Sequence, residues 1–219
     1  MSGLAPPAAF TLVCFAVPFE AKPFIKLVGH RPDLRVVVSG MGATNAARSV
    51  EEALRVRRPA CVFTCGLAGA LNPELQNGDV VFETANVRLA GRLQAAKARN
   101  ASFHCATRVA ITSAEKAALR RRTNADAVEM ESDVIQRACA QAGVPCATVR
   151  AISDEAGEDL PLDFNALMTA DYKLGSAKLL LAIVQAPQRL PALIRLGRNS
   201  ARAAHELSRV LRAVLADAP

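Results

Sequence analysis

The chain has almost none of the aromatic side chains on which nucleic-acid bases stack. Trp is absent from its 219 residues, Tyr occurs once, and aromatic residues make up 4% of the composition. Proteins that bind single-stranded nucleic acid combine aromatic platforms with a basic groove. The net charge of +7 at pH 7 therefore lacks the aromatic partners that would make it a nucleic-acid signal, and we predict no nucleic-acid partner.

The sequence also lacks the cysteine and histidine spacings of common metal sites. No two of its six cysteines form a CxxC pair, and the closest pair, Cys61 and Cys65, has no histidine nearby in the sequence. We predict that most of the cysteines are small core residues in a reducing cytoplasm, and we predict no metal and no cofactor. The cysteines are Cys14, Cys61, Cys65, Cys105, Cys139 and Cys146.

No segment is typical of a secretory signal or a transmembrane helix. The apolar stretch Ala8–Val17 has no basic region before it and reads as a strand. No apolar run reaches the roughly 18 residues that span a bilayer. We expect a cytoplasmic protein.

What is present is an alternation of apolar strands and amphipathic helices. It predicts an α/β fold with a mixed, mostly parallel central sheet flanked by helices on both faces, in one domain over residues 1–219 with a helical C-terminal extension over 187–216. Residues 89–106 are expected to be irregular. The predicted strands are Phe10–Val17, Leu34–Ser39, Ala60–Cys65, Asp79–Glu83, Val109–Thr112, Ala125–Glu129 and Cys146–Ile152. The predicted helices are Phe19–Val28, 43–57, a helix from the N-cap Ser113 to Arg122, Ser132–Ala142, Phe164–Gln185 and Leu190–Ala216.

Five polar or glycine-rich segments follow predicted strands. In sheets of this class, ligands bind outside the carboxyl ends of the strands. We therefore expect the five segments to meet at one edge of the sheet. They are Glu20, Gly40–Gly42, Gly66–Gly69, Glu129–Glu131 and Ser153–Asp154.

Each segment has a structural and a functional interpretation. Gly40-x-Gly42 either offers backbone N–H groups to a ligand or packs a helix on a strand. Of Glu129 and Glu131, one carboxylate could hold the two hydroxyls of a ribose diol, or both could complement the dipole of the helix from Ser132. Asp154 could release a proton, or cap a turn.

Several motifs together resemble the nucleoside phosphorylase family, most closely its 5′-methylthioadenosine/S-adenosylhomocysteine nucleosidases. They occur in the expected order between Phe10 and Asp154. The motifs are SerGlyMetGly at 39–42, GlyLeuAlaGlyAlaLeu at 66–71 with AsnGlyAspValVal at 77–81, ValGluMetGlu at 128–131 and ValArgAlaIleSerAsp at 149–154.

The resemblance implies cleavage of the N-glycosidic bond of a 5′-substituted adenine nucleoside. Asp154 would protonate the purine at N7, Glu131 would hold the ribose diol, and Glu20 would activate water. Met130 would pack on the sugar and Met41 would line the pocket near the 5′ substituent. Glu129, Gly42, Gly69 and Ser153 complete the predicted substrate-binding set.

The resemblance leaves the nucleophile and the substrate open. Where phosphorylases of the family bind phosphate with arginines, the resemblance places Glu20 and Thr64 of this chain, which favours water as the nucleophile. The segment 111–116 and the long basic C-terminus instead resemble hopanoid-associated phosphorylases, which act on adenosylhopane. The alternatives are therefore a phosphate-dependent phosphorylase and, from another class, a non-catalytic basic module that binds lipid or nucleic acid.

The predicted C-terminal helix carries a basic stripe beside a broad apolar face. Its basic residues would either face solvent or contact anionic lipid at a membrane surface. We therefore consider peripheral membrane contact, and we expect a homodimer or higher homo-oligomer. The stripe is Arg195, Arg198, Arg202, His205, Arg209 and Arg212, and the apolar face is Leu193, Ile194, Leu207, Val210, Leu211, Val214 and Leu215.

Overall fold

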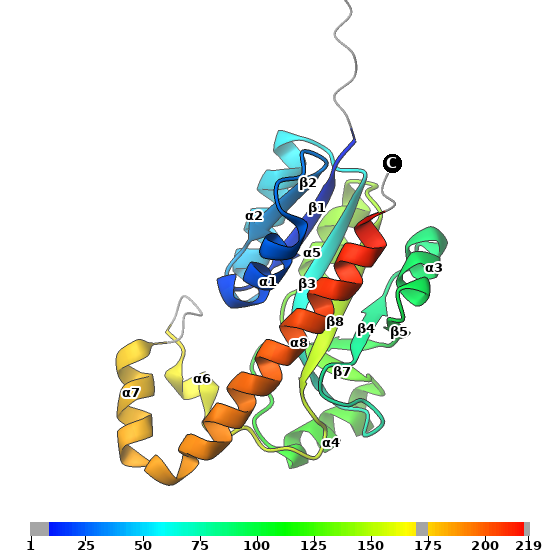
Figure 1. Cartoon of the computed structure of the whole chain (residues 1–219). Coiled ribbons are helices and arrows are strands. Elements are labelled where there is room, and N and C mark those ends of the chain that lie inside the picture. The colour runs from blue at the N-terminus through cyan, green and yellow to red at the C-terminus, as the bar shows by residue number, and fades with distance from the viewer. Residues whose placement is uncertain (1–8, 170–174, 217–219) are drawn as a thin grey trace, which may run out of the picture.

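The computed structural model describes residues 9–169 and 175–216, and Figure 1 shows its arrangement. The strands are β1 (Thr11–Phe15), β2 (Leu34–Val38), β3 (Cys61–Ala70), β4 (Val80–Glu83), β5 (Arg99–Asn100), β6 (Phe103–Cys105), β7 (Ala127–Glu129) and β8 (Cys146–Asp154). The helices are α1 (Pro18–Val28), α2 (Ala43–Val56), α3 (Val87–Ala95), α4 (Ser113–Thr123), α5 (Ser132–Gln141), α6 (Phe164–Leu167), α7 (Ser176–Gln185), the 3₁₀ turn η1 (Pro187–Arg189) and α8 (Leu190–Ala216).

The sheet is mixed and mostly parallel, as the sequence predicts. Its main path runs β2-β1-β3-β8-β4-β5, and β7 pairs with both β3 and β6. The neighbours β2, β1, β3 and β8 are parallel, whereas β4 runs antiparallel to β8 and β7 runs antiparallel to β3. The two long strands β3 and β8 form the centre, and both continue beyond the ends of β1 and β2.

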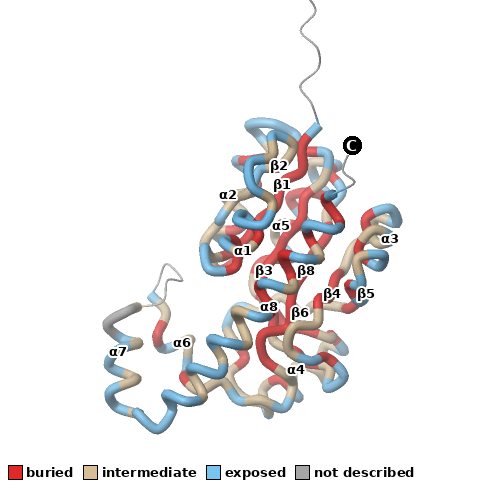
Figure 2. Tube along the Cα trace, in the orientation of Figure 1, coloured by how far each residue is buried: buried red, intermediate tan, exposed pale blue. Residues whose placement is uncertain are grey.

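Helices cover both faces of the sheet. On one face, α1 and α8 lie beside each other over β3 and β8, and on the other face α2 packs against α5. Side chains that alternate along β1 explain this arrangement. Val13 and Phe15 belong to the hydrophobic core on the face of α1 and α8, and Leu12 and Cys14 belong to the core on the face of α2 and α5. Figure 2 shows the resulting buried stripe through β1, β3 and β8.

The structure differs from the predicted elements between residues 89 and 112. The expected irregular stretch contains most of α3 together with β5 and β6. The predicted strand Val109–Thr112 is a loop, because side chains rather than a neighbouring strand satisfy its backbone. Asn165 bonds both the N–H and the C=O of Val109, and Glu115 accepts from the Ile111 N–H. Thr112, not Ser113, is the N-cap of α4.

The long helix predicted over Phe164–Gln185 is also wrong. Asp163 caps the short helix α6, and Met168 takes an extended backbone that ends it. Residues 170–174 of the prediction lie outside the described residues, and a second helix, α7, follows.

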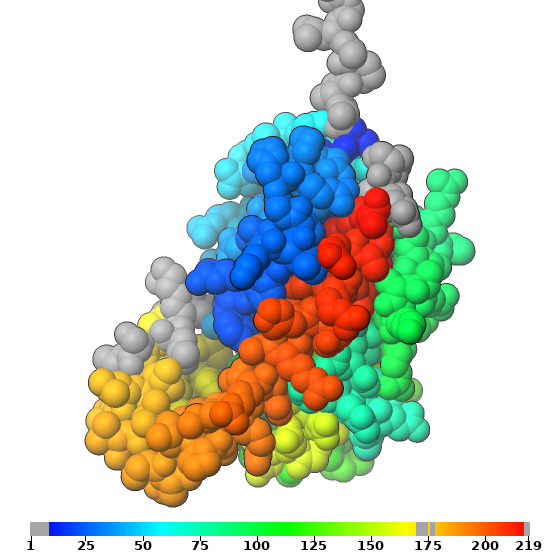
Figure 3. Space-filling view, in the orientation of Figure 1, coloured from blue at the N-terminus to red at the C-terminus, as the bar shows by residue number. Residues whose placement is uncertain are grey.

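The C-terminal helix α8 has two different environments. Over its second half the predicted apolar face is buried against the sheet and α1, with Leu207, Leu211, Val214 and Leu215 at most 2% exposed. That half therefore has no free apolar face for a membrane. The first half extends beyond the sheet with η1 and α7, and Figures 1 and 3 show these segments, in yellow and orange, projecting from the body. We call residues 178–198 the arm.

Within the described residues, no single helix is both long and apolar enough to cross a bilayer. The segments Lys178–Gln185 and Pro187–Ala216 satisfy length and composition only together, and they are bent by 100° at their junction.

Candidate active site

The predicted site residues gather around one cavity beside the extended half of β3. Eight of the nine line it, and Gly42 contacts the side chain of one of the eight. The predicted residues in the wall are Glu20, Met41, Gly69, Glu129, Met130, Glu131, Ser153 and Asp154. The segment Arg108–Ala110 and Leu160 close the side of the cavity that is near α4.

Glu20 lies in the first turn of α1 and points toward β3. Its Oε1 accepts the backbone N–H of Leu67 at 3.0 Å, and its Oε2 accepts the N–H of Val17 at 3.4 Å. Gly66 makes this approach possible. A Cβ built at Gly66 would lie 3.0 Å from Glu20 Oε2 and only 2.4 Å from Arg150 Nη1. Any larger residue at Gly66 would therefore push apart the carboxylate and the guanidinium.

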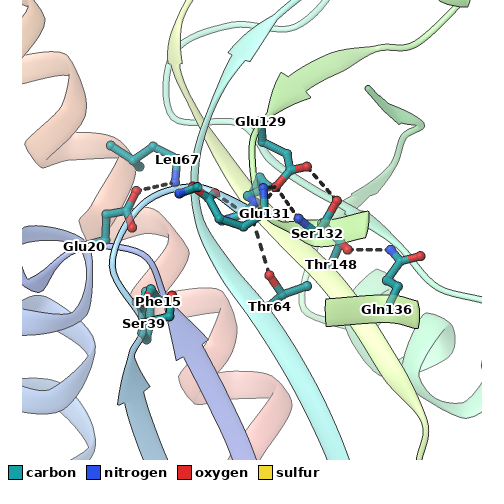
Figure 4. A network of polar contacts seen from close by, with 12 residues as sticks. Phe15, Glu20, Ser39, Thr64, Leu67, Glu129, Glu131, Ser132, Gln136 and Thr148 are labelled. Carbon is teal, nitrogen blue, oxygen red and sulfur yellow. Dashed lines mark hydrogen bonds and ion pairs between the residues drawn. The ribbon is translucent and has the colours of Figure 1, made fainter. Parts of the chain in front are cut away.

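Glu129 is fully engaged inside the protein (Figure 4). Its Oε2 accepts the N–H groups of Glu131 and Ser132 at 3.0 and 2.9 Å, and its Oε1 accepts the Ser132 hydroxyl at 2.6 Å. Arg150 Nη2 forms an ion pair with Glu129 Oε2. The carboxylate thus satisfies the first turn of α5, which is the structural interpretation considered for it.

Glu131 keeps more of its carboxylate open. Its Oε1 accepts the backbone N–H of Gly42 at 2.9 Å, and its Oε2 lies 3.6 Å from Arg150 Nη2. The side chain is 10% exposed, against 1% for Glu129. Of the two glutamates, Glu131 is therefore the one that is available to a ligand.

Asp154 lies at the end of β8, where a bulge brings it opposite Gly69. A Cβ at Gly69 would lie 3.0 Å from Asp154 Oδ2, so the glycine leaves room for the carboxylate. Ser153 Oγ donates to Asp154 Oδ1 at 2.7 Å, and the Lys116 ammonium lies 2.6 Å from Oδ2. Lys116 is completely buried, whereas the Asp154 side chain is 11% exposed.

Burial and Arg150 set the charges of the glutamates. Burial raises the pKa of Glu20 to about 7, against the attraction of Arg150 and the Leu67 N–H. Burial likewise raises the pKa of Glu131, and the neighbouring Glu129 adds to the rise. Burial disfavours the charged form of Glu129 too, but Arg150 and the hydrogen bonds from α5 outweigh it and lower its pKa.

A family match over most of the chain agrees with this geometry. The family model of the phosphorylase superfamily matches residues 17–113 and 101–185. The chain belongs to the phosphorylase superfamily. The match confirms the resemblance to the nucleoside phosphorylase family, while the hopanoid-associated subgroup stays a prediction.

Curated relatives of this phosphorylase-superfamily chain are nucleosidases. An aminodeoxyfutalosine nucleosidase of Campylobacter jejuni is 27% identical over 189 residues, which is 71% of this chain and 80% of the relative. A 5′-methylthioadenosine/S-adenosylhomocysteine nucleosidase of Marinomonas sp. is 29% identical over 168 residues, which is 60% of this chain and 72% of the relative.

Solved structures share the fold. A futalosine hydrolase of Helicobacter pylori aligns with a TM-score of 0.75 at 15% identity, covering 96% of this chain and 98% of that one. A 5′-methylthioadenosine/S-adenosylhomocysteine nucleosidase from the same organism aligns with a TM-score of 0.73 at 16% identity, covering 96% and 99%.

Two charged residues of the site were not predicted. Arg150 is an arginine within the apolar run of β8, and a charge inside a buried strand indicates a buried counter-ion. That signal was available in the sequence. Lys116 gave no such signal, because it lies in a helix rich in charged residues and its burial depends on the loop after β8.

All six cysteines are free, and Cys14, Cys65 and Cys139 are buried. Across residues 9–169 and 175–216, no three His, Cys, Asp or Glu side chains are grouped so that they could hold a metal ion.

Proposed function

We propose that this protein hydrolyses the N-glycosidic bond of a 5′-substituted adenine nucleoside. The observation that carries the proposal is the arrangement of Glu20, Glu131 and Asp154 around one cavity. Breaking this bond needs an acid that protonates the leaving purine. It also needs a general base that orients water on the opposite face of an oxocarbenium-like ribosyl group. The names of the curated relatives support the same reaction class.

Each carboxyl group then has a separate role. Asp154 passes a proton to N7 of the purine, so that the C1′–N9 bond breaks with its electrons retained by the base. Glu131 accepts hydrogen bonds from the two ribose hydroxyls, since Gly42 and Arg150 already fix its orientation. Glu20 takes a proton from the attacking water. Met130 and Met41 contact the sugar and the 5′ substituent.

In this proposal Glu129 and Ser153 position neighbouring side chains. Glu129 anchors Arg150 and the start of α5, and Ser153 holds Asp154 Oδ1. Gly69 leaves room for Asp154, and Gly42 supports Glu131 through its backbone.

Charge favours water over phosphate as the nucleophile. Arg150 lies behind the cavity wall, is 1% exposed and faces Glu20, Glu129 and Glu131. Arg108, which lines the cavity on the side near α4, is paired with Glu115. A phosphate ion placed beside Glu20 would meet more negative than positive charge, in a region of low dielectric where repulsion is strong. The phosphorylase alternative needs a free cation, whereas Arg108, Arg150 and Lys116 are each already paired with a carboxylate.

A second observation concerns the surface at which the protein would encounter its substrate. Five of the eleven exposed large hydrophobic side chains of the described residues lie on the arm: Leu180, Leu181, Val184, Leu190 and Ile194. Lys178, Arg189, Arg195 and Arg198 are exposed on the same segment, which contains no acidic residue. Apolar and basic side chains together fit an anionic membrane surface. We propose peripheral membrane contact through the arm, and a lipid-linked adenine nucleoside such as adenosylhopane as a candidate substrate.

The deciding experiment measures adenine release from several 5′-substituted adenosines, with and without phosphate. We expect free adenine and a free ribosyl product in phosphate-free buffer. Asp154→Asn should lower kcat by about 10²-fold or more, the range that general acid catalysis supplies. Asp163→Asn, which changes the exposed cap of α6, is the matched control. Product formed only with phosphate, as a ribose 1-phosphate ester, would establish the phosphorylase, and no cleavage at all would favour a non-catalytic binding module.

A further inference from the structure

Lys116 is a lysine without any contact with solvent, and it lies directly behind the acid of the proposed reaction. Its side chain is 0% exposed. The ammonium donates to the carbonyl oxygens of Glu155 and Glu158, both at 2.8 Å, and lies 2.6 Å from Asp154 Oδ2. A buried ammonium is costly unless it is paired and fully hydrogen-bonded. All three of its protons have a partner here.

The same contacts determine what Asp154 can do at rest. Its Oδ2 faces Lys116, and its Oδ1 accepts the Ser153 hydroxyl at 2.7 Å, a shorter contact than the 3.3 Å from that hydroxyl to the carbonyl oxygen of Ala68. A carboxylate that accepts from an ammonium receives a hydrogen bond at the oxygen that would otherwise hold the acidic proton. Two donors contact Asp154, the Ser153 hydroxyl and the Lys116 ammonium, and the ammonium, 2.6 Å from Oδ2, carries the more acidic proton.

We infer that Lys116 is a positioning residue that holds Asp154 at the cavity and supplies the proton that Asp154 passes to the leaving base. This inference rests on the proposed function and assigns the source of its proton. As the C1′–N9 bond breaks, a Lys116 Nζ–H bond breaks and an O–H bond forms on Asp154, which in turn transfers its proton to the purine nitrogen. Water adds to C1′ and loses a proton to Glu20. Glu20 thus gains the proton that Lys116 loses. Glu20 returns its proton to solvent after product leaves, and Lys116 regains a proton through Asp154, whose side chain is 11% exposed at the cavity.

Other charged groups near Lys116 are engaged elsewhere. Glu115, on the same helix, accepts from the N–H groups of Ile111 and Thr112 and pairs with Arg108. Asp159, in the loop after β8, accepts the Ser113 N–H at 2.7 Å. Asp154 is therefore the one carboxylate in ion-pair contact with Lys116 among the described residues.

The test compares two leaving groups, because only one of them needs a proton. Adenine leaves after protonation, whereas nitrophenolate leaves 4-nitrophenyl β-ribofuranoside without it. With Lys116→Met we expect adenine release to fall by about 10²-fold or more and nitrophenolate release to stay within about threefold of the wild type. Lys26→Met, which alters an exposed lysine on α1, should change neither rate.

Lys116→Gln provides a second variant, in case the apolar side chain disturbs the loop after β8. Its amide keeps a hydrogen-bond donor near Asp154 but has no acidic proton, and we expect the same selective loss of adenine release. Equal losses for both leaving groups, in variants with a native thermal transition, would make Lys116 a purely structural residue and overturn the inference. A wild-type enzyme that releases neither adenine nor nitrophenolate would instead overturn the proposed function.

Discussion

The backbone N–H of Gly42 donates to Glu131 Oε1 across 2.9 Å, and this contact joins the loop after β2 to the start of α5. Arg150 lies 3.6 Å from the other carboxylate oxygen. Glu131 is thus oriented before any ligand arrives, so binding the two ribose hydroxyls, as we propose, would cost little conformational entropy.

Replacing Glu131 with Gln should separate its role in sugar binding from its role in folding. The amide oxygen can still accept from Gly42, but the charge that strengthens hydrogen bonds to a diol is lost. We expect kcat/KM for a ribonucleoside to fall by about 10- to 10²-fold, since a hydrogen bond to a charged group contributes about 1.5–3 kcal/mol. Steady-state kinetics with the 2′-deoxy analogue should show a smaller loss. Asp133→Asn, in the same turn but exposed, is the control, and equal losses for both sugars would contradict the assignment.

Glu20 should determine the acidic side of the pH–rate profile. Its pKa is raised to about 7, and only the ionised form can take a proton from water. We therefore expect kcat/KM to rise with pH and to level off above about 7, and Glu20→Gln to remove nearly all turnover. The measurement is the initial rate between pH 5 and 9 in phosphate-free buffer, at about one-unit steps. A profile that is flat across this range would exclude Glu20 as the base.

The same pKa predicts how stability depends on pH. The pKa of Glu20 is higher in the folded chain than the ordinary value of 4.5, so its contribution to stability is complete below about 4.5 and is lost as the pH rises through about 7. The loss amounts to at most about 3.5 kcal/mol, because one pKa unit is equivalent to about 1.4 kcal/mol. Urea unfolding at pH 4.5 and pH 8 should show a smaller difference for Glu20→Gln than for the wild type. Glu51→Gln, on the exposed side of α2, should leave the difference unchanged.

Arg150 is expected to contribute strongly to the stability of the folded chain. Arg150→Met leaves Glu20, Glu129 and Glu131 buried together without their cation, and removing one partner of a buried ion pair costs about 3–5 kcal/mol. Urea unfolding should record that loss, and adding Glu129→Gln should recover part of it. Arg137→Met removes an exposed partner of Asp133 and should have an effect below about 1 kcal/mol. A stable Arg150→Met protein would mean that these carboxyl groups are protonated in the folded chain.

The arm should bind anionic vesicles in co-sedimentation assays. Binding should weaken as salt is added, because the electrostatic part is screened, and the double variant Leu181→Ser, Val184→Ser should abolish it. Val56→Ser removes an exposed apolar side chain at the end of α2 and serves as the control. No sedimentation at low salt would rule out the membrane role. A change in mass by light scattering in the arm variant would assign these side chains to contact with a second copy of the chain.

The sequence determined the central strands and most helices, and its motifs predicted the carboxylates that the fold gathers at one cavity, because local periodicity and short motifs encode these features. Tertiary structure decided which of these carboxylates pair with buried cations and which stay open to the cavity. Sequence reasoning placed Glu129 and Glu131 at a common edge of parallel strands, but β7 runs antiparallel to the extended end of β3, and this pairing directs both glutamates back toward Arg150. The burial of Leu207 and Leu211, and of Lys116 behind Asp154, likewise depends on segments distant in the chain. No local pattern contains that information, because the free energy of a buried charge depends on partners that only the folded chain brings within contact.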